Sequence, residues 1–421
     1  MPAHREPAEP EPGEQQTELA TPEPAAPEPA TPETSAPALP LWVIAREWGR
    51  IGVTGFGGPP AHIALLRKLC VERNSWLPAT EFEDGIAATS LLPGPASTQL
   101  AIFCAWRLGG PLGAIVGGAC FIVPGLIIIL ALSVLFLAHS PPVWVKGAAA
   151  GAGASVPAVA LAAAISLMPA SWGRAGLDRI ARARWLLYLV AGAVAANLAG
   201  QFLVAVLLAC GLIEWLVVRR PVGSRAGPAG SGGMMIPLAA RVLTAGVFGS
   251  IAWEAVKVGA LSFGGGFVII PLMQHDAVHT YHWMTSAQFL SAVALGQVTP
   301  GPVVQTVAVV GYAAAGLGGG LLAALVAFAP SFAFVLAGGP HFDKFRRSST
   351  AQAFLAGAGP AAIGAIAGAS VELGLGLTQW WQVGVLAAAV GWLVLLRRGV
   401  VSAILGAAVI GIAVALAGLA T

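Results

Sequence analysis

The chain has 421 residues, of which 57% are hydrophobic and only 10% are charged. Soluble domains carry about 25% charged residues, so this composition excludes an ordinary soluble domain, whose surface it could not cover. The net charge of +3 combines an acidic start with a basic remainder, because residues 41–421 carry 21 Lys and Arg against 11 Asp and Glu. Part of that positive excess is expected to mark cytoplasmic loops of a membrane protein, and the rest suits the attraction of an anion.

Residues 1–40 differ from the rest of the chain. They hold eight Glu and eleven Pro and contain no apolar run. Such a segment cannot bury enough apolar surface to fold, so we expect a disordered tail, with a docking segment as the alternative. No apolar stretch follows a basic start, which argues against a secretory signal.

Apolar segments fill the chain after the tail and predict an all-α polytopic membrane protein, since a span needs about 20 apolar residues. They form an N-terminal transporter repeat (41–218) and a C-terminal one (242–421), separated by a basic cytoplasmic linker (219–241). In chain order the first set is 41–66, 82–108, 111–138, 147–169, 185–199 and 201–218. The second set is 242–272, 285–317, 319–338, 351–373, 382–396 and 399–419.

The two sets repeat one another at a spacing of 207 residues. Glu47 recurs as Glu254, Phe56-Gly57-Gly58 as Phe263-Gly264-Gly265, and Pro93-Gly94-Pro95 as Pro300-Gly301-Pro302. Both copies are therefore broken by Gly and Pro at the same two places. Duplicated halves with interrupted apolar segments are typical of secondary transporters, and the interruptions indicate the binding site.

Basic residues alternate between equivalent loops of the two halves. Loop 67–73 is basic and its counterpart 274–280 has no Lys or Arg, whereas loop 139–146 has one Lys and its counterpart 341–350 has three basic residues. By the positive-inside rule the halves have opposite orientations, which predicts inverted-topology repeats with discontinuous helices. Whether segments 41–66 and 242–272 are broken spans or re-entrant hairpins stays open, and with it the side on which the tail lies.

The breaks supply the candidate binding residues. Gly runs and Pro weaken a helix at membrane depth, and such backbone is tolerated only inside protein or along a watery cavity. A helix that begins after a Pro presents free N–H groups, which bind anions. Packing kinks and local capping are the alternatives. The candidates are Gly57, Gly58, Pro93, Gly94, Pro95, Ser97 and Thr98, and in the second half Gly264, Gly265, Pro300, Gly301, Pro302, Gln305 and Thr306.

Ionisable side chains near these breaks are candidates for charge balance or proton coupling. Glu47 with Arg50, and Glu254 with Lys257, stand at i, i+3, so each pair can also satisfy itself on one helix face. His275, His279 and His282 with Asp276 have a spacing that would suit a metal on one helical face, but we expect an interfacial polar stretch and no metal site.

At Phe56-Gly57-Gly58-Pro59, Phe263-Gly264-Gly265-Gly266 and the two Pro-Gly-Pro motifs, the chain resembles the chromate ion transporter family in its long, two-domain form. The resemblance covers residues 41–420. It implies efflux of chromate across the bacterial inner membrane, chromate resistance, and antiport coupled to the proton-motive force. The expected partners are then chromate or sulfate, protons, the lipid bilayer and a second copy of the chain, with no nucleic acid.

Three other functions were weighed. A sulfate or related oxyanion carrier, inward or outward, fits the same motifs because sulfate shares the charge and shape of chromate. An anion channel also fits. The sequence has no nucleotide-binding motif, and no HExxH or GxSxG motif at membrane depth, so we expect neither ATP use nor an enzyme nor a cofactor.

Overall fold

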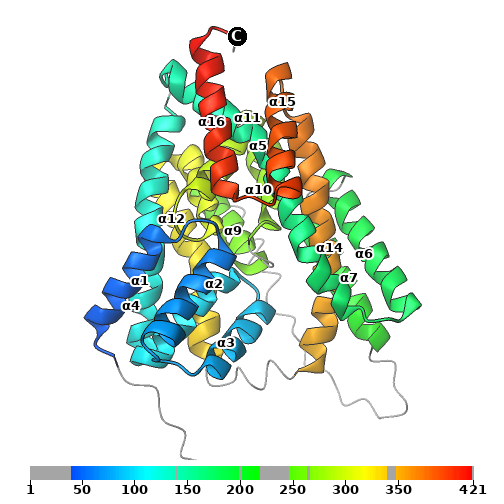
Figure 1. The fold of residues 1–421 in the computed structure, drawn as a ribbon. Coiled ribbons are helices and arrows are strands. Elements are labelled where there is room, and N and C mark those ends of the chain that lie inside the picture. The colour runs from blue at the N-terminus through cyan, green and yellow to red at the C-terminus, as the bar shows by residue number, and fades with distance from the viewer. Residues whose placement is uncertain are drawn as a thin grey trace, which may run out of the picture. The chain divides into compact units, whose positions relative to one another are not determined.

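The computed structural model describes residues 39–138, 140–198, 202–218, 246–262, 266–338 and 348–419. Every element in these ranges is a helix, which confirms the all-α class (Figure 1). The first half holds α1 (Leu41–Thr54), α2 (Pro59–Arg67), η1 (Lys68–Arg73), α3 (Ala79–Leu91), α4 (Ala96–Phe136), α5 (Val143–Arg174), α6 (Arg179–Leu198) and α7 (Leu203–Val218). The second half holds α9 (Gly246–Leu261), α10 (Ile269–Gln274), η3 (His275–Thr280), α11 (Ser286–Val298), η4 (Val303–Gln305), α12 (Thr306–Gly338), α14 (Ser349–Leu375), α15 (Trp380–Val390), η6 (Gly391–Leu395) and α16 (Val400–Leu416).

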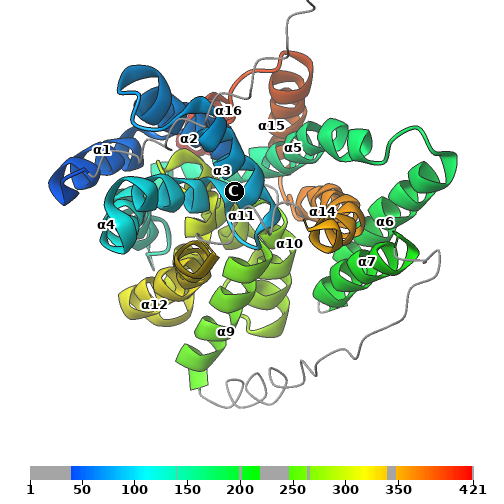
Figure 2. The same cartoon turned by 90° about the horizontal axis from the view of Figure 1, so that it is seen from below.

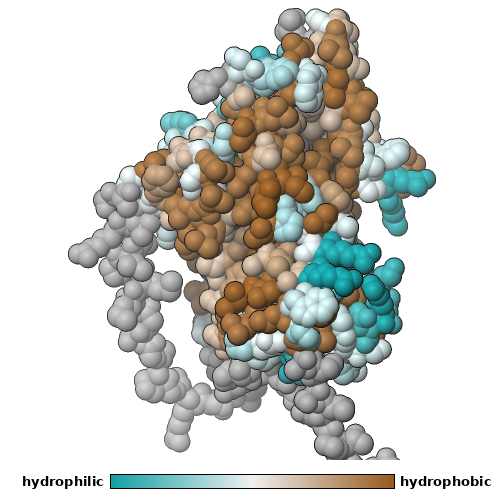
Figure 3. Space-filling model, turned by 90° about the vertical axis from the view of Figure 1, so that its left-hand side faces the viewer, coloured by the Kyte–Doolittle hydropathy of each residue, from teal (hydrophilic) through white to brown (hydrophobic). Residues whose placement is uncertain are grey.

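The surface of these helices is that of a multi-pass membrane protein. Four helical stretches in the described part are long and apolar enough to cross a bilayer: Ala96–Phe136, Val143–Arg174, Val303–Gly338 and Ser349–Leu375. Figure 3 shows apolar side chains over most of the face that it presents, with hydrophilic ones gathered in a few clusters. Several predictions lie outside the described residues: the tail up to residue 38, the linker 219–241, Gly264 with Gly265, and the basic stretch 341–347.

Two of the long helices reverse direction inside. Gly109 and Gly110 interrupt α4, and Ala315 and Gly316 interrupt α12. Gly110 and Gly316 both have φ +62, which favours Gly at the turn. The arms then fold back on each other, because Gly113 lies against the Ala105 carbonyl and Gly319 against that of Gly311. These turns are 206 residues apart, one fewer than the motifs, so one residue is missing from the second copy between the Pro-Gly-Pro break and this turn.

The first half opens with two helical hairpins. The first arm of α4 (96–108) runs opposite to α1, since the Trp48 indole donates to the Ala101 carbonyl at 2.8 Å and Leu39 N donates to Leu108 O at 2.7 Å. It also runs opposite to α3, because Arg107 at its end forms an ion pair with Glu81 at the beginning of α3. Between them α2 returns from the break at residues 55–58.

The second half repeats this arrangement, because an ion pair between Lys257 on α9 and Asp276 on η3 joins the two arms of its first hairpin. Segments 41–66 and 242–272 are thus hairpins with the breaks at their tips, the choice that the sequence left open. Residues 219–245, which connect the two halves, lie outside the described residues.

The long helices establish the inverted arrangement. The second arm of α4 packs against the second arm of α12 in the opposite direction, with Gly118 at Phe332 and Gly320 at Leu130. Helices α5 and α14 are likewise antiparallel, since Gly359 lies near Arg174 while Gly374 lies near Pro157. Figure 2 shows further neighbours of these long helices, with α9 beside α12 and both α6 and α7 beside α14. Small residues at these crossings let the backbones approach closely, as bilayer packing favours.

Candidate functional site

The hairpin tips of the two halves meet inside the protein. The Gly301 N–H donates to the Gly55 carbonyl at 3.0 Å, which joins the first tip of one half to the second tip of the other. A Cβ added at Gly58 would lie 3.7 Å from the Val303 side chain, and one added at Gly266 would lie 3.4 Å from that of Val304. Three of the four breaks therefore share one region around the start of η4.

The fourth break, Pro93-Gly94-Pro95, also packs into the opposite half. Gly94 has φ +121, and a Cβ there would lie 3.3 Å from the Gly259 carbonyl on α9 and 3.3 Å from the Ser331 hydroxyl on α12. The equivalent Pro300 carbonyl contacts Gly125 on α4. Gly125 and Ser331 are 206 residues apart, so each Pro-Gly-Pro tip rests on the same point of the other half's long helix.

Helix N-termini point into this region without side-chain caps. Helix α4 begins after Pro95, η4 after Pro302 and α2 after Gly58, and none of these N-cap residues makes a side-chain cap hydrogen bond. The first N–H groups of a helix have no partner within the helix, and they carry its positive dipole end. Uncapped N-termini of this kind can hold an oxyanion without any charged side chain.

The polar side chains of the first turns are completely buried. Ser97, Thr98, Gln305 and Thr306 are each at most 1% exposed. Ser97 pairs with His62: the His62 Nε2 donates to the Gly55 carbonyl at 2.9 Å, so its Nδ1 accepts from the Ser97 hydroxyl at 3.3 Å.

The two threonines differ in their partners. The Thr306 hydroxyl donates to the Val303 carbonyl at 2.8 Å, which is the local capping weighed as an alternative. The Thr98 hydroxyl has no hydrogen-bond partner among the described residues. Of the two, only Thr98 is free to contact a ligand.

Gln99 and Gln305 are equivalent residues of the two halves, although they are 206 residues apart and not 207. Their amide nitrogens donate to the Pro93 carbonyl at 2.7 Å and to the Ile122 carbonyl at 2.8 Å, respectively. Both Oε1 atoms lack a partner within the described ranges. The missing residue in the second copy shifts the register to 206, so comparison at 207 wrongly aligned Thr98 with Gln305.

Three further side chains of the site were not among the sequence candidates. His62 supports Ser97, and the hydroxyls of Ser262 and Ser331 are buried without a described partner. The sequence repeat could not identify Ser331, because the equivalent residue of the first half is Gly125, which has no side chain to match. His62 is 0% exposed and lies edge-on to Phe121, with ring centroids 5.0 Å apart.

The charged candidates behave differently in the two halves. Glu254 and Lys257 form the expected pair, with Oε2 and Nζ 2.6 Å apart, and Asp276 joins them. In the first half the Glu47 carboxylate lies 3.6 Å from the guanidinium of the neighbouring Arg46, while Arg50 is on the exposed face of α1.

The histidine stretch does not converge. His279 faces Glu372 at 3.7 Å, the His282 ring bonds to the Val278 carbonyl at 2.8 Å, and Asp276 is engaged by Lys257. The described part of the chain contains no group of three His, Cys, Asp or Glu side chains placed to hold a metal ion.

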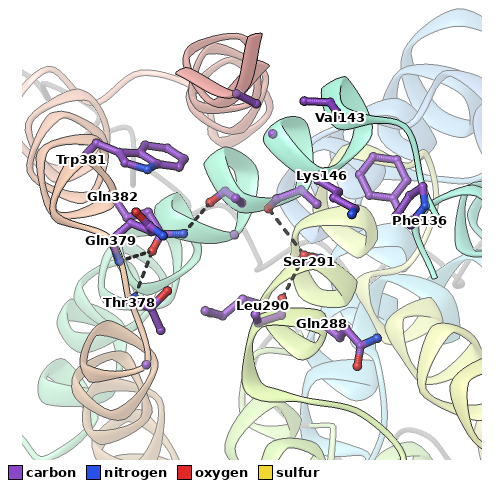
Figure 4. A pocket seen from close by; sticks show the side chains of 18 of the residues that line it. Phe136, Val143, Lys146, Gln288, Leu290, Ser291, Thr378, Gln379, Trp381 and Gln382 are labelled. Carbon is purple, nitrogen blue, oxygen red and sulfur yellow. Dashed lines mark hydrogen bonds between the residues drawn. The ribbon is translucent and has the colours of Figure 1, made fainter. Parts of the chain in front are cut away.

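One cavity between the described helices lies away from the tips. It has a volume of about 690 Å³ and is lined by the first turns of α5, α11 and α15, with Lys146 at its edge (Figure 4). Polar side chains including Gln288, Ser291 and Gln382 face it. A smaller apolar cavity of about 250 Å³ adjoins Pro93. The Pro-Gly-Pro tips are buried, since Gln99 and Gln305 beside them are both 0% exposed, whereas Phe56 and Gly57 at the tip of the first hairpin are exposed.

Comparison with known proteins gives a consistent result. The family described as chromate transporter matches residues 42–215 and 249–412, one stretch in each half. The chain is 32% identical to a chromate transport protein of Cupriavidus metallidurans, over 80% of this chain and 84% of that protein. It is 31% identical to a probable chromate transport protein of Synechococcus elongatus, over 80% and 86%. A chromate transport protein of Pseudomonas aeruginosa is 28% identical over 77% and 79%. No solved structure matches.

Proposed function

The chain belongs to the chromate transporter family, and from this premise we propose that it is a secondary carrier that exports chromate from the bacterial cytoplasm across the inner membrane. Export lowers the internal chromate concentration and confers resistance. The energy comes from protons that move inward down the proton-motive force. The chain acts as a carrier rather than as an enzyme, because its buried polar groups suit binding and release of an anion.

The meeting of four hairpin tips from two inverted halves is the observation that carries this proposal. The Gly301–Gly55 hydrogen bond and the Gly94–Ser331 contact bring backbone from both halves to one place. Free N–H groups at the starts of α2, α4 and η4 offer donors from several directions, as a tetrahedral oxyanion requires. A site made of neutral dipoles binds the anion without the desolvation cost of a fixed charge, so release stays possible.

The inverted hairpins also suggest how access alternates. Each Pro-Gly-Pro tip rests on the long helix of the opposite half, at Gly125 or Ser331. A tilt of one half's hairpins relative to the other half's long helices would open the site from one end and close it from the other. Transporters built from inverted repeats commonly work by such rocking around a fixed midplane site.

A sulfate carrier is the second candidate. Helix N-termini and amide groups read charge and shape, which sulfate and chromate share, so these donors discriminate weakly between them. Competition between the two anions therefore decides which is the better substrate. An anion channel differs from both candidates because its flux neither saturates nor responds to a proton gradient.

Everted membrane vesicles provide the test of this function, since export from cells becomes uptake into such vesicles. We expect saturable chromate uptake that an imposed proton gradient stimulates and that an uncoupler abolishes. Excess sulfate should inhibit uptake less than an equal amount of unlabelled chromate. Uptake that sulfate suppresses as strongly as chromate would favour the sulfate carrier, and uptake no faster than in vesicles lacking the protein would exclude both.

A further inference from the structure

A buried cluster in the second half places two carboxylates on one ammonium group. Lys257 Nζ lies 2.6 Å from Glu254 Oε2 and also forms an ion pair with Asp276. Glu254 is 1% exposed, and the side chains of Lys257 and Asp276 are 15% and 9% exposed. When all three are ionised, one negative charge remains unbalanced in apolar surroundings, which is unfavourable. Uptake of one proton removes that cost.

The two carboxylates of the cluster have unequal support. Asp276 accepts hydrogen bonds from Lys257 and from the Thr280 hydroxyl at 3.3 Å. The oxygens of Glu254 approach Lys257 but have no hydrogen-bond partner among the described residues. Glu254 has only the Lys257 ammonium beside it, which it shares with Asp276, whereas Asp276 has a second donor in Thr280. The carboxylate with fewer donors gains more from becoming a neutral acid, so the proton belongs on Glu254.

The surrounding groups do not neutralise Glu254. Helix α12 packs along α9 and carries no charged residue, with Tyr312 as its one titratable side chain. On the other side, His279 is occupied by Glu372 on α14, and Gln274 also donates to Glu372 at 3.2 Å. His275 lies near Asp276, and Tyr281 lies near all three groups of the cluster, but a neutral phenol does not balance the charge of a carboxylate.

This cluster exists in one half only. In the first half the equivalent of Glu254 is Glu47, whose neighbour Arg46 has a side chain that is 68% exposed, and the equivalent of Asp276 is Leu69. Glu254 lies eight residues before Ser262, which is about 12 Å along α9 from the hairpin tip. The Lys257–Asp276 bridge joins the two arms of that hairpin, so a change in its charge acts on an element that lines the candidate anion site.

We propose that Glu254, Lys257 and Asp276 form the proton-binding site that couples transport to the proton gradient. The Glu254 carboxylate accepts one proton and becomes a neutral acid, and Lys257 then pairs with Asp276 alone. When Glu254 loses the proton, two carboxylates again compete for Lys257. The ion pair between Lys257 and Asp276 that joins the two arms of the hairpin is then weakened. This inference rests on the proposed function, because it locates the proton of a proton-coupled carrier.

Replacement of Glu254 by Gln mimics the protonated acid and tests the inference. Two assays in vesicles separate the steps: net chromate uptake driven by a proton gradient, and exchange of labelled for unlabelled chromate without a gradient. In the Glu254→Gln variant we expect stimulation by the gradient to fall by about tenfold or more while exchange stays within about twofold. Glu47→Gln removes the equivalent acid of the first half and should keep the stimulation.

The outcomes separate this inference from the function on which it rests. Wild-type protein that moves no chromate in either assay contradicts the proposed function itself. Wild-type transport that ignores the gradient, or Glu254→Gln protein that responds to it like wild type, overturns the inference alone. For a Glu254→Gln variant that does not insert, the purified wild-type protein decides: chromate binding should release about one proton per chain, and the absence of proton release overturns the inference.

Discussion

At the scale of single residues, the candidate site is defined by buried polar atoms that lack partners. Thr98 Oγ1, Gln99 Oε1, Gln305 Oε1 and the hydroxyls of Ser262 and Ser331 belong to this group within the described ranges. Most buried polar groups in proteins are hydrogen-bonded, because an unpaired one costs about 1–3 kcal/mol. Their presence around the hairpin tips supports the proposal that these groups serve a ligand.

Thr98 and Thr306 give a matched test of that argument. Replacement of Thr98 by Val keeps the shape and removes a hydroxyl that has no partner among the described residues, so we expect chromate binding to weaken by about fivefold to tenfold. Replacement of Thr306 by Val removes a hydroxyl that is already bound to the Val303 carbonyl, so binding should change by less than about twofold. The measurement is the KM of chromate uptake in vesicles. Equal effects of the two substitutions would contradict the assignment of Thr98 to the site.

At the scale of elements, the sequence predicted the positions of the breaks better than the path of the chain between them. Gly and Pro mark where a helix ends, and those marks were correct at residues 55–58 and 93–95. Whether the chain then crosses or returns depends on packing partners such as Trp48 with Ala101, which local patterns do not encode. The match of Gln99 with Gln305 was missed because a single absent residue changes the register between two otherwise equivalent hairpins.

The role of Asp276 could not be predicted either. It lies 19 residues from Lys257, across the tip of a hairpin whose return the sequence left open. The first half offered no guide, because Leu69 stands at the equivalent position.

The inverted hairpins make a prediction about the two membrane faces. Ser75 and His282 are equivalent exposed residues after η1 and η3, with φ of 49 and 53, so both turns have the same backbone conformation. In opposite orientations they face opposite compartments. A cysteine at position 75 should react with a membrane-impermeant maleimide in everted vesicles only, and one at position 282 in intact spheroplasts only.

Two controls belong to this labelling experiment. The native Cys70, Cys104 and Cys210 are buried and Cys120 is partly buried, so background labelling should be low. If both introduced cysteines react from the same side, the inverted arrangement is wrong.

At the scale of the whole molecule, the central claim is that both halves build one anion site together. The tips of each half contact the other half. The Gly301 N–H donates to the Gly55 carbonyl, and Gly94 lies beside the Ser331 hydroxyl. A half alone would hold only part of the donors. The matched but unequal side chains of the two tips, such as Thr98 free and Thr306 capped, make that site asymmetric.

Equilibrium binding of labelled chromate to the purified protein tests this claim most directly, with Gly94→Leu and Gly301→Leu as variants. A Leu side chain would meet the Gly259 carbonyl at the first position and the Gln305 amide at the second. Gly176→Ala is the control, because it has a similar positive φ of 68 but open space around it. We predict one chromate per wild-type chain, retained in the control and lost in each leucine variant. Two chromates per chain, with one lost in each variant, would contradict a shared site.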